Sequence, residues 1–129
     1  MKTKRIFKTK TFSRWAKGIL SDEQLCVAAK EIMQGLYEAD LGSGLCKKRI
    51  AIPGRGKRGS TRTLVAKGTA AGIFFIVGRQ KSDSGADFSS SQVDAAKLIG
   101  SALQRADVSH IEGLVSDGVL KEICNENHQ

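Results

Sequence analysis

The residues best suited to chemistry in this chain of 129 residues are the cations of one central stretch. Residues 41–82, the basic stretch, contain ten Lys and Arg and no Asp or Glu. The formal charges of residues 1–40, 41–82 and 83–129 are +3, +10 and −5, which sum to the +8 of the chain. Such a concentrated positive charge indicates a polyanion as partner: nucleic acid, an anionic membrane surface or an acidic protein.

The residue types in the basic stretch limit the reactions that it could catalyse. It has no carboxylate and no histidine, so it supplies no carboxylate pair, histidine triad or two-metal site. RNA, however, carries its own nucleophile, because the 2′-hydroxyl lies beside the scissile phosphate. Arg and Lys stabilise charge on the phosphoryl oxygens, and a lysine crowded by cations has a lowered pKa and can act as a base. Metal-independent RNA cleavage is therefore feasible, while composition alone favours simple phosphate binding.

A glycine-rich segment within the basic stretch has the spacing of nucleotide-binding loops without their context. Three glycines of residues 53–59 spell GxGxxG, and two of them nearly fit a Walker A pattern. A dinucleotide loop needs a buried strand before it and a helix after it, but Pro53 precedes these glycines and a β-branched run follows. Ser60 occupies the position where Walker A needs Lys. The segment is predicted to be a flexible turn that presents Arg55, Lys57 and Arg58.

One strand and two helices are predicted before the basic stretch. Residues 4–8 have the pattern of a short strand. Apolar residues of 12–19 recur at three- and four-residue spacing, which predicts a short helix ending near Gly18. Ser21 and Gln24 match a capping box and predict the start of a second helix that continues to about residue 38. The expected buried face of this helix consists of Leu25, Ala29, Ile32 and Leu36.

Within the basic stretch the hydrophobic period changes to that of strands. Strands are predicted over residues 45–52, 61–67 and 73–80, and their short connections favour antiparallel pairing. Lys47 and Arg49 fall on the same face of the first of these strands because side chains alternate. The third strand begins with five consecutive apolar residues, which indicates a central position in the sheet.

The C-terminal part is predicted to be mainly helical. Residues 83–90 form a polar loop, and Ser91 is a candidate cap for a helix that runs to about Ala106. After a turn at residues 116–118, residues 119–123 fit either an edge strand or a last helical turn. The expected apolar side of the helix consists of Leu98, Ile99, Ala102 and Leu103. The predicted fold class is α+β, with two N-terminal helices on a mainly antiparallel, strongly basic sheet and a C-terminal helix, in one domain.

Composition also limits the environment of the protein. The longest strongly apolar run, residues 73–77, is far shorter than the roughly 20 residues of a membrane span. No apolar segment follows the basic N-terminus, so no secretory signal is expected. Three widely separated cysteines predict neither a disulfide framework nor a metal site. We therefore expect a cytoplasmic protein without membrane contact, metal or cofactor.

The order of these elements and their residues resembles the RelE/HigB superfamily of bacterial toxins. The residues that carry the resemblance follow the two helices, in the order Leu45-x-Lys47-x-Arg49, Gly59-x-x-Arg62-Thr-Leu-Val65 and Phe75-Ile-Val-Gly78-Arg79-Gln-Lys81-Ser82. The similarity covers residues 4–107, the core of a single RelE-like toxin domain, and leaves residues 108–129 as a C-terminal extension. A longer, HigB-like branch of the superfamily is the most similar.

Membership would imply a toxin of a type II toxin–antitoxin system, generally an mRNA endoribonuclease that acts in the ribosomal A site and blocks translation. The implied partners are mRNA, the ribosome and a cognate antitoxin of the helix-turn-helix type, with operator DNA bound only through the antitoxin complex. Arg62 matches the arginine expected at the scissile phosphate. The implied catalytic residues are Lys47, Arg49, Arg62, Arg79 and Lys81. The implied RNA-binding residues are Lys48, Arg55, Lys57, Arg58 and Ser82.

The chain departs from the superfamily pattern at two places where relatives carry a ring side chain. Thr61 stands where many relatives have Tyr, and Ser82-Asp83 stands where some have His or Tyr. An aromatic residue that could stack on a base is thus missing from the expected positions. Two alternatives to an active nuclease stay open: a non-catalytic basic module that binds nucleic acid, and a degenerate toxin that only pairs with an antitoxin.

Overall fold

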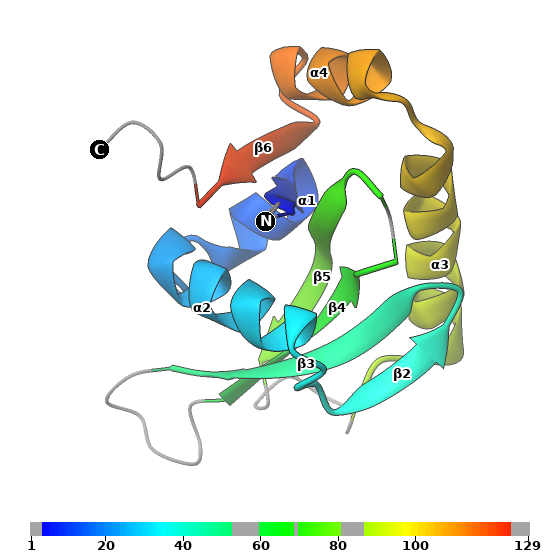
Figure 1. Ribbon diagram of the computed structural model, residues 1–129. Helices are drawn as coiled ribbons and strands as arrows, with labels where there is room; N and C mark the ends of the chain where they lie inside the picture. The colour runs from blue at the N-terminus through cyan, green and yellow to red at the C-terminus, as the bar shows by residue number, and fades with distance from the viewer. Residues whose placement is uncertain (1–3, 53–59, 69, 81–86, 125–129) are drawn as a thin grey trace.

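A six-stranded sheet in the order β2-β3-β4-β5-β1-β6 forms the centre of the fold (Figure 1). The computed structural model describes residues 4–52, 60–68, 70–80 and 87–124. In chain order the elements are β1 (Arg5–Thr9), α1 (Lys10–Ala16), α2 (Asp22–Met33), β2 (Ala39–Gly42), β3 (Leu45–Ala51), β4 (Ser60–Ala66), β5 (Gly72–Gln80), α3 (Ser90–Arg105), α4 (Val108–Ser116) and β6 (Leu120–Ile123). No helix in the described part of the chain is long and apolar enough to cross a membrane.

The three strands predicted in the basic stretch are confirmed as β3, β4 and β5. They pair in antiparallel order, and β5 lies inside the sheet between β4 and β1. The prediction of a mainly antiparallel sheet is also confirmed, with one exception, because β1 pairs with β5 in parallel. Sequence periodicity did not predict β2, a four-residue strand at one edge of the sheet.

Helix α2 begins as predicted and ends earlier than predicted. The Ser21 hydroxyl accepts a hydrogen bond from the Gln24 N–H, and the Gln24 side chain accepts one from the Ser21 N–H. The expected continuation to residue 38 is wrong, because Gly35 adopts the left-handed conformation (φ +86°) that ends helices. Leu36 therefore lies beyond the helix and is exposed instead of packed.

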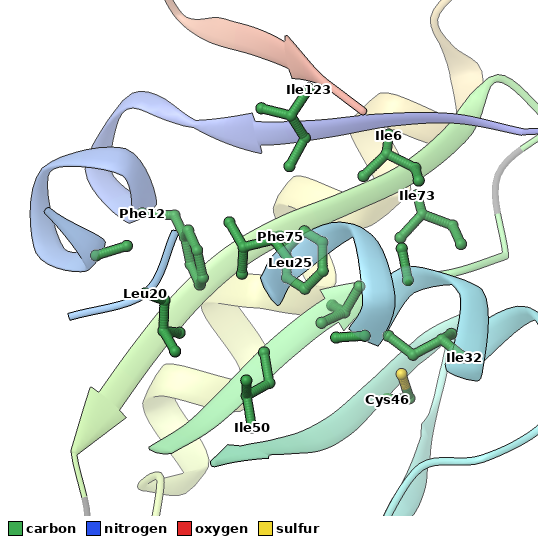
Figure 2. Packing of buried hydrophobic residues seen from close by; sticks show 14 residues of the cluster. Ile6, Phe12, Leu20, Leu25, Ile32, Cys46, Ile50, Ile73, Phe75 and Ile123 are labelled. Atoms are coloured by element: carbon green, nitrogen blue, oxygen red, sulfur yellow. The ribbon is translucent and has the colours of Figure 1, made fainter. Parts of the chain in front are cut away.

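Each face of the sheet has its own hydrophobic core. Helices α1 and α2 pack on one face, where Phe12, Leu25 and Phe75 are fully buried (Figure 2). On the other face, α3 and α4 pack over the aromatic rings of Phe7 and Phe74, which are stacked at a centroid distance of 4.9 Å. Alternate residues of one strand therefore enter different cores, which explains why β5 is apolar on both faces.

Helix α3 has a different start and a different buried face from those predicted. Its cap is Ser89, whose hydroxyl accepts a hydrogen bond from the Gln92 N–H, two residues before the predicted cap Ser91. Leu98 and Ile99 are 74% and 43% exposed. Of the four expected residues only Leu103 is buried, and the helix packs on the sheet through Leu103 together with Ala96 and Gly100. Small residues lie at this contact because they let the helix approach the sheet closely. A Cβ at Gly100 would lie 3.4 Å from the Ala66 Cβ of β4.

The C-terminal residues complete the sheet. The predicted turn at residues 116–118 is confirmed, with Gly118 at φ +81°. Of the two alternatives for residues 119–123, the edge strand is correct, since β6 pairs antiparallel with β1. Helix α4 was not predicted. Ile111 of α4 and Leu120 of β6 are buried in the core under α3, so this segment contributes to the packed domain.

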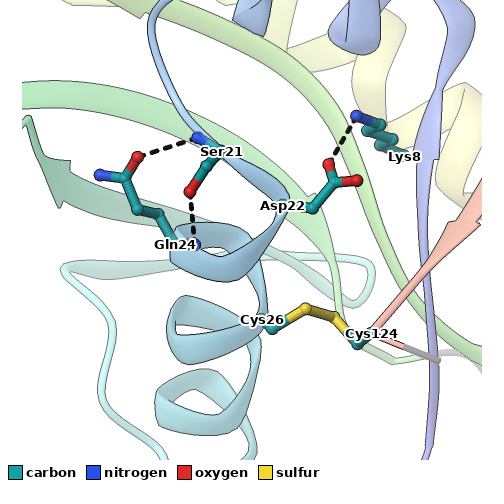
Figure 3. The surroundings of a disulfide bond; sticks show 6 residues. All are labelled: Lys8, Ser21, Asp22, Gln24, Cys26 and Cys124. Atoms are coloured by element: carbon teal, nitrogen blue, oxygen red, sulfur yellow. Dashed lines mark hydrogen bonds and ion pairs between the residues drawn. A yellow bond between two sulfur atoms is a disulfide. The ribbon is translucent and has the colours of Figure 1, made fainter. Parts of the chain in front are cut away.

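A disulfide joins α2 to the C-terminal end of the described chain. Cys26 of α2 and Cys124, which follows β6, are bonded with a Cα–Cα distance of 5.6 Å (Figure 3). The expectation of no disulfide is wrong, because the fold brings together two cysteines 98 residues apart in sequence. Close by, the Lys8 ammonium lies 2.7 Å from the Asp22 carboxylate and ties β1 to the start of α2. Cys46 is a free thiol, and burial raises its pKa to about 12.

Candidate nucleic-acid interface

Three arginines lie side by side across three adjacent strands. Arg49 of β3 is directly opposite Arg62 of β4, and Arg62 is directly opposite Arg79 of β5. Cβ atoms of opposed residues in antiparallel strands lie roughly 4.5–5.5 Å apart, and like charges in such pairs repel. A row of three cations is therefore unfavourable by itself and favours the binding of an anion that all three can share.

A β-bulge in β5 places Arg79 in this row. Leu64 of β4 pairs with Val77, while the next residue, Val65, pairs with Phe75, so Ile76 is the extra residue of the bulge. An extra residue reverses the facing of every later side chain in the strand. Arg79 consequently lies on the same face as Arg62. The resemblance implies both Arg79 and Lys81 as catalytic cations, and the bulge explains how Arg79 comes to lie on this face.

Lys47 lies on the same face as the arginine row and forms an ion pair with Asp87. The Lys47 ammonium donates to the Asp87 carboxylate. Arg79 donates to the backbone oxygen of Asp87 at 2.8 Å, and the Phe88 N–H donates to the Asp87 carboxylate at 2.8 Å. Partial burial raises the pKa of Asp87, but Lys47, the Phe88 N–H and the charge of Arg62 outweigh it and leave that pKa below its ordinary value. The carboxylate thus stays ionised at neutral pH and occupies part of the cation cluster.

Three of these cations, Lys47, Arg49 and Arg62, line a pocket that also contains two carboxylates, and we call it the cation pocket. Its volume is about 190 Å³, several times the ~30 Å³ of one water molecule in the liquid. Sequence analysis did not assign these two carboxylates, Glu38 and Asp87, to the site. They lie outside the basic stretch, three residues before it and five residues after it. The β2–β3 pairing brings Glu38 close to the cations, because it places the next residue, Ala39, opposite Lys47. The lining residues are Glu38, Ala39, Lys47, Arg49, Arg62 and Asp87.

Glu38 supports the rim of this pocket through the backbone. Its carboxylate accepts a hydrogen bond of 2.7 Å from the Arg49 N–H. Glu38 and Asp87 therefore add proton acceptors to a cluster of cations, a combination that general acid–base chemistry requires and that the basic stretch alone lacks.

An aromatic residue that sequence analysis did not assign to the site lies beside the arginine row. The Arg79 guanidinium is 5.9 Å from the centroid of the Phe88 ring, and Phe88 is only partly buried. Thr61, which occupies the place of the aromatic in many relatives, is fully buried on the opposite face, where its hydroxyl donates to the Ile50 carbonyl at 2.9 Å. An aromatic side chain is thus present at the site, on a different element from the expected one.

One predicted RNA-binding residue lies on the wrong face. Lys48 alternates with Lys47 and Arg49, so it faces α2 and is 6% exposed. Its ammonium lies 2.8 Å from the Glu31 carboxylate and 2.9 Å from the Leu36 carbonyl, which it holds in the bend after α2. The prediction that Lys48 binds RNA is therefore corrected to a structural role. Five further residues predicted for catalysis or RNA binding lie outside the described part of the chain: Arg55, Lys57, Arg58, Lys81 and Ser82.

Comparison with known proteins identifies the family. Within residues 4–52, 60–68, 70–80 and 87–124, no three His, Cys, Asp or Glu side chains converge as a metal site would need. None of the curated proteins compared with the chain matches it. The family model described as the RelE toxin of the RelE/RelB toxin–antitoxin system matches residues 4–123, which include the cation cluster, α4 and β6. The chain therefore belongs to the RelE toxin family, whose members are toxins that pair with an antitoxin.

Proposed function

We propose that the chain is a metal-independent endoribonuclease that cleaves mRNA on the ribosome and thereby blocks translation. The observation that supports this proposal most strongly is the row of Arg49, Arg62 and Arg79 in cross-strand register. Three opposed cations beside Lys47 suit the phosphoryl oxygens of a transition state, where negative charge develops, better than a neutral ligand. Family membership supports the toxin role.

The proposed reaction uses the nucleophile of RNA itself. The 2′-hydroxyl attacks the adjacent phosphorus, the bond to the 5′-oxygen breaks, and the products are a 2′,3′-cyclic phosphate and a 5′-hydroxyl. Arg62 is central in the row and contacts the non-bridging oxygens, with Arg49 and Arg79 on either side. Lys47 exchanges its Asp87 partner for the RNA phosphate. The rim carboxylates of Glu38 and Asp87 are available to accept the proton of the 2′-hydroxyl, and water supplies the proton that the departing 5′-oxygen takes up.

The proposed environment and partners follow from the same role. An mRNA substrate implies action in the cytoplasm, with the cognate antitoxin, of the helix-turn-helix type, as inhibitor and as the route to operator DNA. We assign to Phe88, whose ring lies 5.9 Å from the Arg79 guanidinium, the role of stacking on a nucleobase next to the scissile phosphate. The residues outside the described part keep their predicted roles, with Lys81 in catalysis and Arg55, Lys57, Arg58 and Ser82 in RNA binding.

A growth assay with matched variants tests the proposal. Induced expression of the parent chain should arrest growth, and Arg62→Ala should relieve the arrest while the protein remains folded. Lys121→Ala removes an exposed cation of β6 and should be as toxic as the parent. Primer extension on mRNA from the arrested cells should reveal discrete cuts within coding regions. If Arg62→Ala, Lys47→Ala and Arg49→Ala all remain fully toxic, the site is wrongly assigned.

A second candidate function is RNA binding without cleavage. It is favoured by the Asp87 carboxylate, which occupies the cation cluster and has a lowered pKa that makes it a weak base. This alternative predicts salt-sensitive RNA binding and an mRNA map without cuts.

A further inference from the structure

A second hollow lies between α2 and β3 and shares two residues, Glu38 and Arg49, with the cation pocket. We call it the α2–β3 groove. Its volume is about 440 Å³, within the ~300–1,000 Å³ of pockets that hold small ligands. Half of its lining is apolar: Val27 is 58% exposed, while Ala28 and Ile50 are buried. The lining residues are Gln24, Val27, Ala28, Glu31, Glu38, Arg49, Ile50 and Ala51.

A backbone donor and a carboxylate lie next to each other where the groove meets the cation pocket. The Arg49 N–H donates to Oε1 of Glu38 at 2.7 Å. The second oxygen of this carboxylate, Oε2, has no hydrogen-bond partner among the described residues. Strand β2 pairs with β3 only from Leu45 to Lys47, so no described strand occupies the edge of β3 beside Arg49. A ligand therefore meets one N–H donor and one carboxylate at this edge.

Among the nucleobases, guanine matches this pair of groups best. Its Watson–Crick edge presents O6 as acceptor beside two donors, N1–H and N2–H, and such edges are what proteins read in single-stranded RNA. A carboxylate accepts both donors at once, while a backbone N–H donates to O6. The edges of adenine and cytosine offer one amino group each, and the edge of uracil offers a single N–H between two acceptors. Each of these three bases leaves one carboxylate oxygen without a donor.

The walls of the groove suit the faces of a base and exclude its phosphate. Extruded bases are held between aromatic or apolar side chains, and here Val27 and Ile50 are available for that contact. Glu31 and Glu38 place two carboxylates in the groove, and Glu31 is already paired with Lys48 at 2.8 Å. Phosphate is repelled by these carboxylates and attracted by the arginine row. A nucleotide at this junction is thus oriented with its phosphate in the cation pocket and its base in the groove.

We propose that the α2–β3 groove binds the guanine base of the nucleotide whose 3′-phosphate lies in the cation pocket. Glu38 accepts N1–H and N2–H, and the Arg49 N–H passes from Glu38 to O6. Binding of the base does not require cleavage, whereas the position of the cut rests on the proposed function: the 2′-hydroxyl that attacks belongs to this guanosine, so the cut follows G. With Glu38 engaged by the base, Asp87 is the rim carboxylate that remains for the proton of the 2′-hydroxyl.

The test compares Glu38→Gln with Glu23→Gln, two removals of an exposed carboxylate that keep the size of the side chain. Glu23 lies in the first turn of α2 and does not line the groove. Binding of guanosine 3′-monophosphate and of adenosine 3′-monophosphate is measured by titration calorimetry on the full chain. The parent and Glu23→Gln should bind the guanosine nucleotide about tenfold more tightly, as one bidentate base contact allows. Glu38→Gln should reduce this preference to less than about twofold, whereas a purely structural role of Glu38 would weaken both nucleotides alike.

Nuclear magnetic resonance on the unaltered chain gives an independent readout, should Glu38→Gln fail to fold. Guanosine 3′-monophosphate should give nuclear Overhauser effects from its base proton to the methyl groups of Val27 and Ile50. Inorganic phosphate should leave the resonances of both residues in place. Absence of base contacts at both residues overturns the proposal, as does equal affinity of the parent for the two nucleotides.

Primer extension on mRNA separates this subsite from the proposed function. Cuts that follow G in the parent support both. A guanine preference in binding together with an mRNA map without cuts would retain the subsite and reject the endoribonuclease. Cuts that ignore the preceding base would reject the subsite and retain the endoribonuclease.

Discussion

At the scale of single residues, the chemistry of this toxin depends on how a row of like charges is kept stable. Three arginines oppose one another across the sheet: Arg49, Arg62 and Arg79. Asp87 lies beside them, with its carboxylate bound to the Lys47 ammonium and its backbone oxygen bound to the Arg79 guanidinium. Asp87 thus occupies part of the position that we assign to an RNA phosphate. The same carboxylate that stabilises the free protein must then compete with the ligand.

Replacement of Asp87 by Asn should strengthen RNA binding. The amide keeps the size of the side chain and removes the competing charge, so affinity for a short single-stranded RNA should rise about fivefold, as expected for a partly exposed ion pair. Because the pKa of Asp87 is lowered, its carboxylate is ionised from pH 6 to pH 8, and the gain should be constant over that range. It should disappear only at pH values low enough to protonate the parent carboxylate.

Fluorescence anisotropy with a labelled RNA checks this expectation, with Asp94→Asn as control because Asp94 is an exposed acid on α3. Equal or weaker binding by Asp87→Asn would show that the carboxylate positions Lys47 for the RNA and does not compete with it.

At the scale of elements, the bulge in β5 organises both faces of the sheet at once. It turns Arg79 toward the cation pocket and Gly78 toward α1. Trp15 of α1 packs directly on Gly78, where a Cβ would lie 2.2 Å from its ring. Glycine is needed here because of close packing and not because of its backbone angle.

Gly78→Ala should therefore destabilise the fold. The new methyl group must push Trp15 away, and overpacking of this kind costs ~1–3 kcal/mol. Thermal unfolding followed by circular dichroism measures the loss. Gly113→Ala is the control, since a Cβ at Gly113 of α4 meets nothing within 4 Å and alanine favours a helix. If both variants unfold at the parent temperature, Trp15 is not held against β5 as described.

The disulfide between Cys26 and Cys124 stabilises the fold by connecting α2 to the end of β6. It closes a loop of about 98 residues, so its reduction should lower the free energy of unfolding by roughly 2–4 kcal/mol. Urea unfolding with and without reductant measures this difference. The double variant Cys26→Ser/Cys124→Ser should be insensitive to reductant and match the reduced parent. Cys46 should not react with thiol reagents in the folded state, because it is buried and its pKa is raised.

At the scale of the whole molecule, the positive charge is concentrated in residues 41–82 of the sequence. The fold then distributes the cations between the two faces of the sheet. Lys47, Arg49, Arg62 and Arg79 share the face of α3, while Lys8 and Lys48 are buried and paired with Asp22 and Glu31. The surplus of +8 is thus not spread evenly. We assign phosphate binding to the cations that share a face with the pocket, whereas the buried cations under the helices are paired with carboxylates and stabilise the packing.

Salt dependence should distinguish these two classes of cation. For single-stranded RNA, the logarithm of the affinity should fall with the logarithm of salt concentration by about 0.7 for each phosphate contact. Arg62→Ala should reduce this slope by about 0.7, whereas Lys121→Ala should leave it unchanged. A slope that is identical in all three proteins would mean that Arg62 contacts no phosphate.

Much of the fold follows from short-range pattern. The capping box of α2, the three strands of the basic stretch and the common face of Lys47 and Arg49 depend on a few neighbouring residues, and each is observed. Alternation also implies that Lys48 faces the opposite way from its neighbours. The early end of α2 was mispredicted because Gly35 adopts the left-handed conformation that ends helices. The buried face of α3 was mispredicted because packing against the sheet favours small residues over large ones at a close contact.

The sequence by itself determined which residue types are available: a stretch rich in cations and free of acids, on strands whose period is two. Only the tertiary structure decided which of them meet. The bulge in β5, the parallel pairing of β1 with β5, the arrival of Glu38 and Asp87 at the pocket and the pairing of Cys26 with Cys124 all involve residues distant in sequence. Periodicity describes a segment of a few residues, whereas register and long-range contacts depend on the packing of the whole chain.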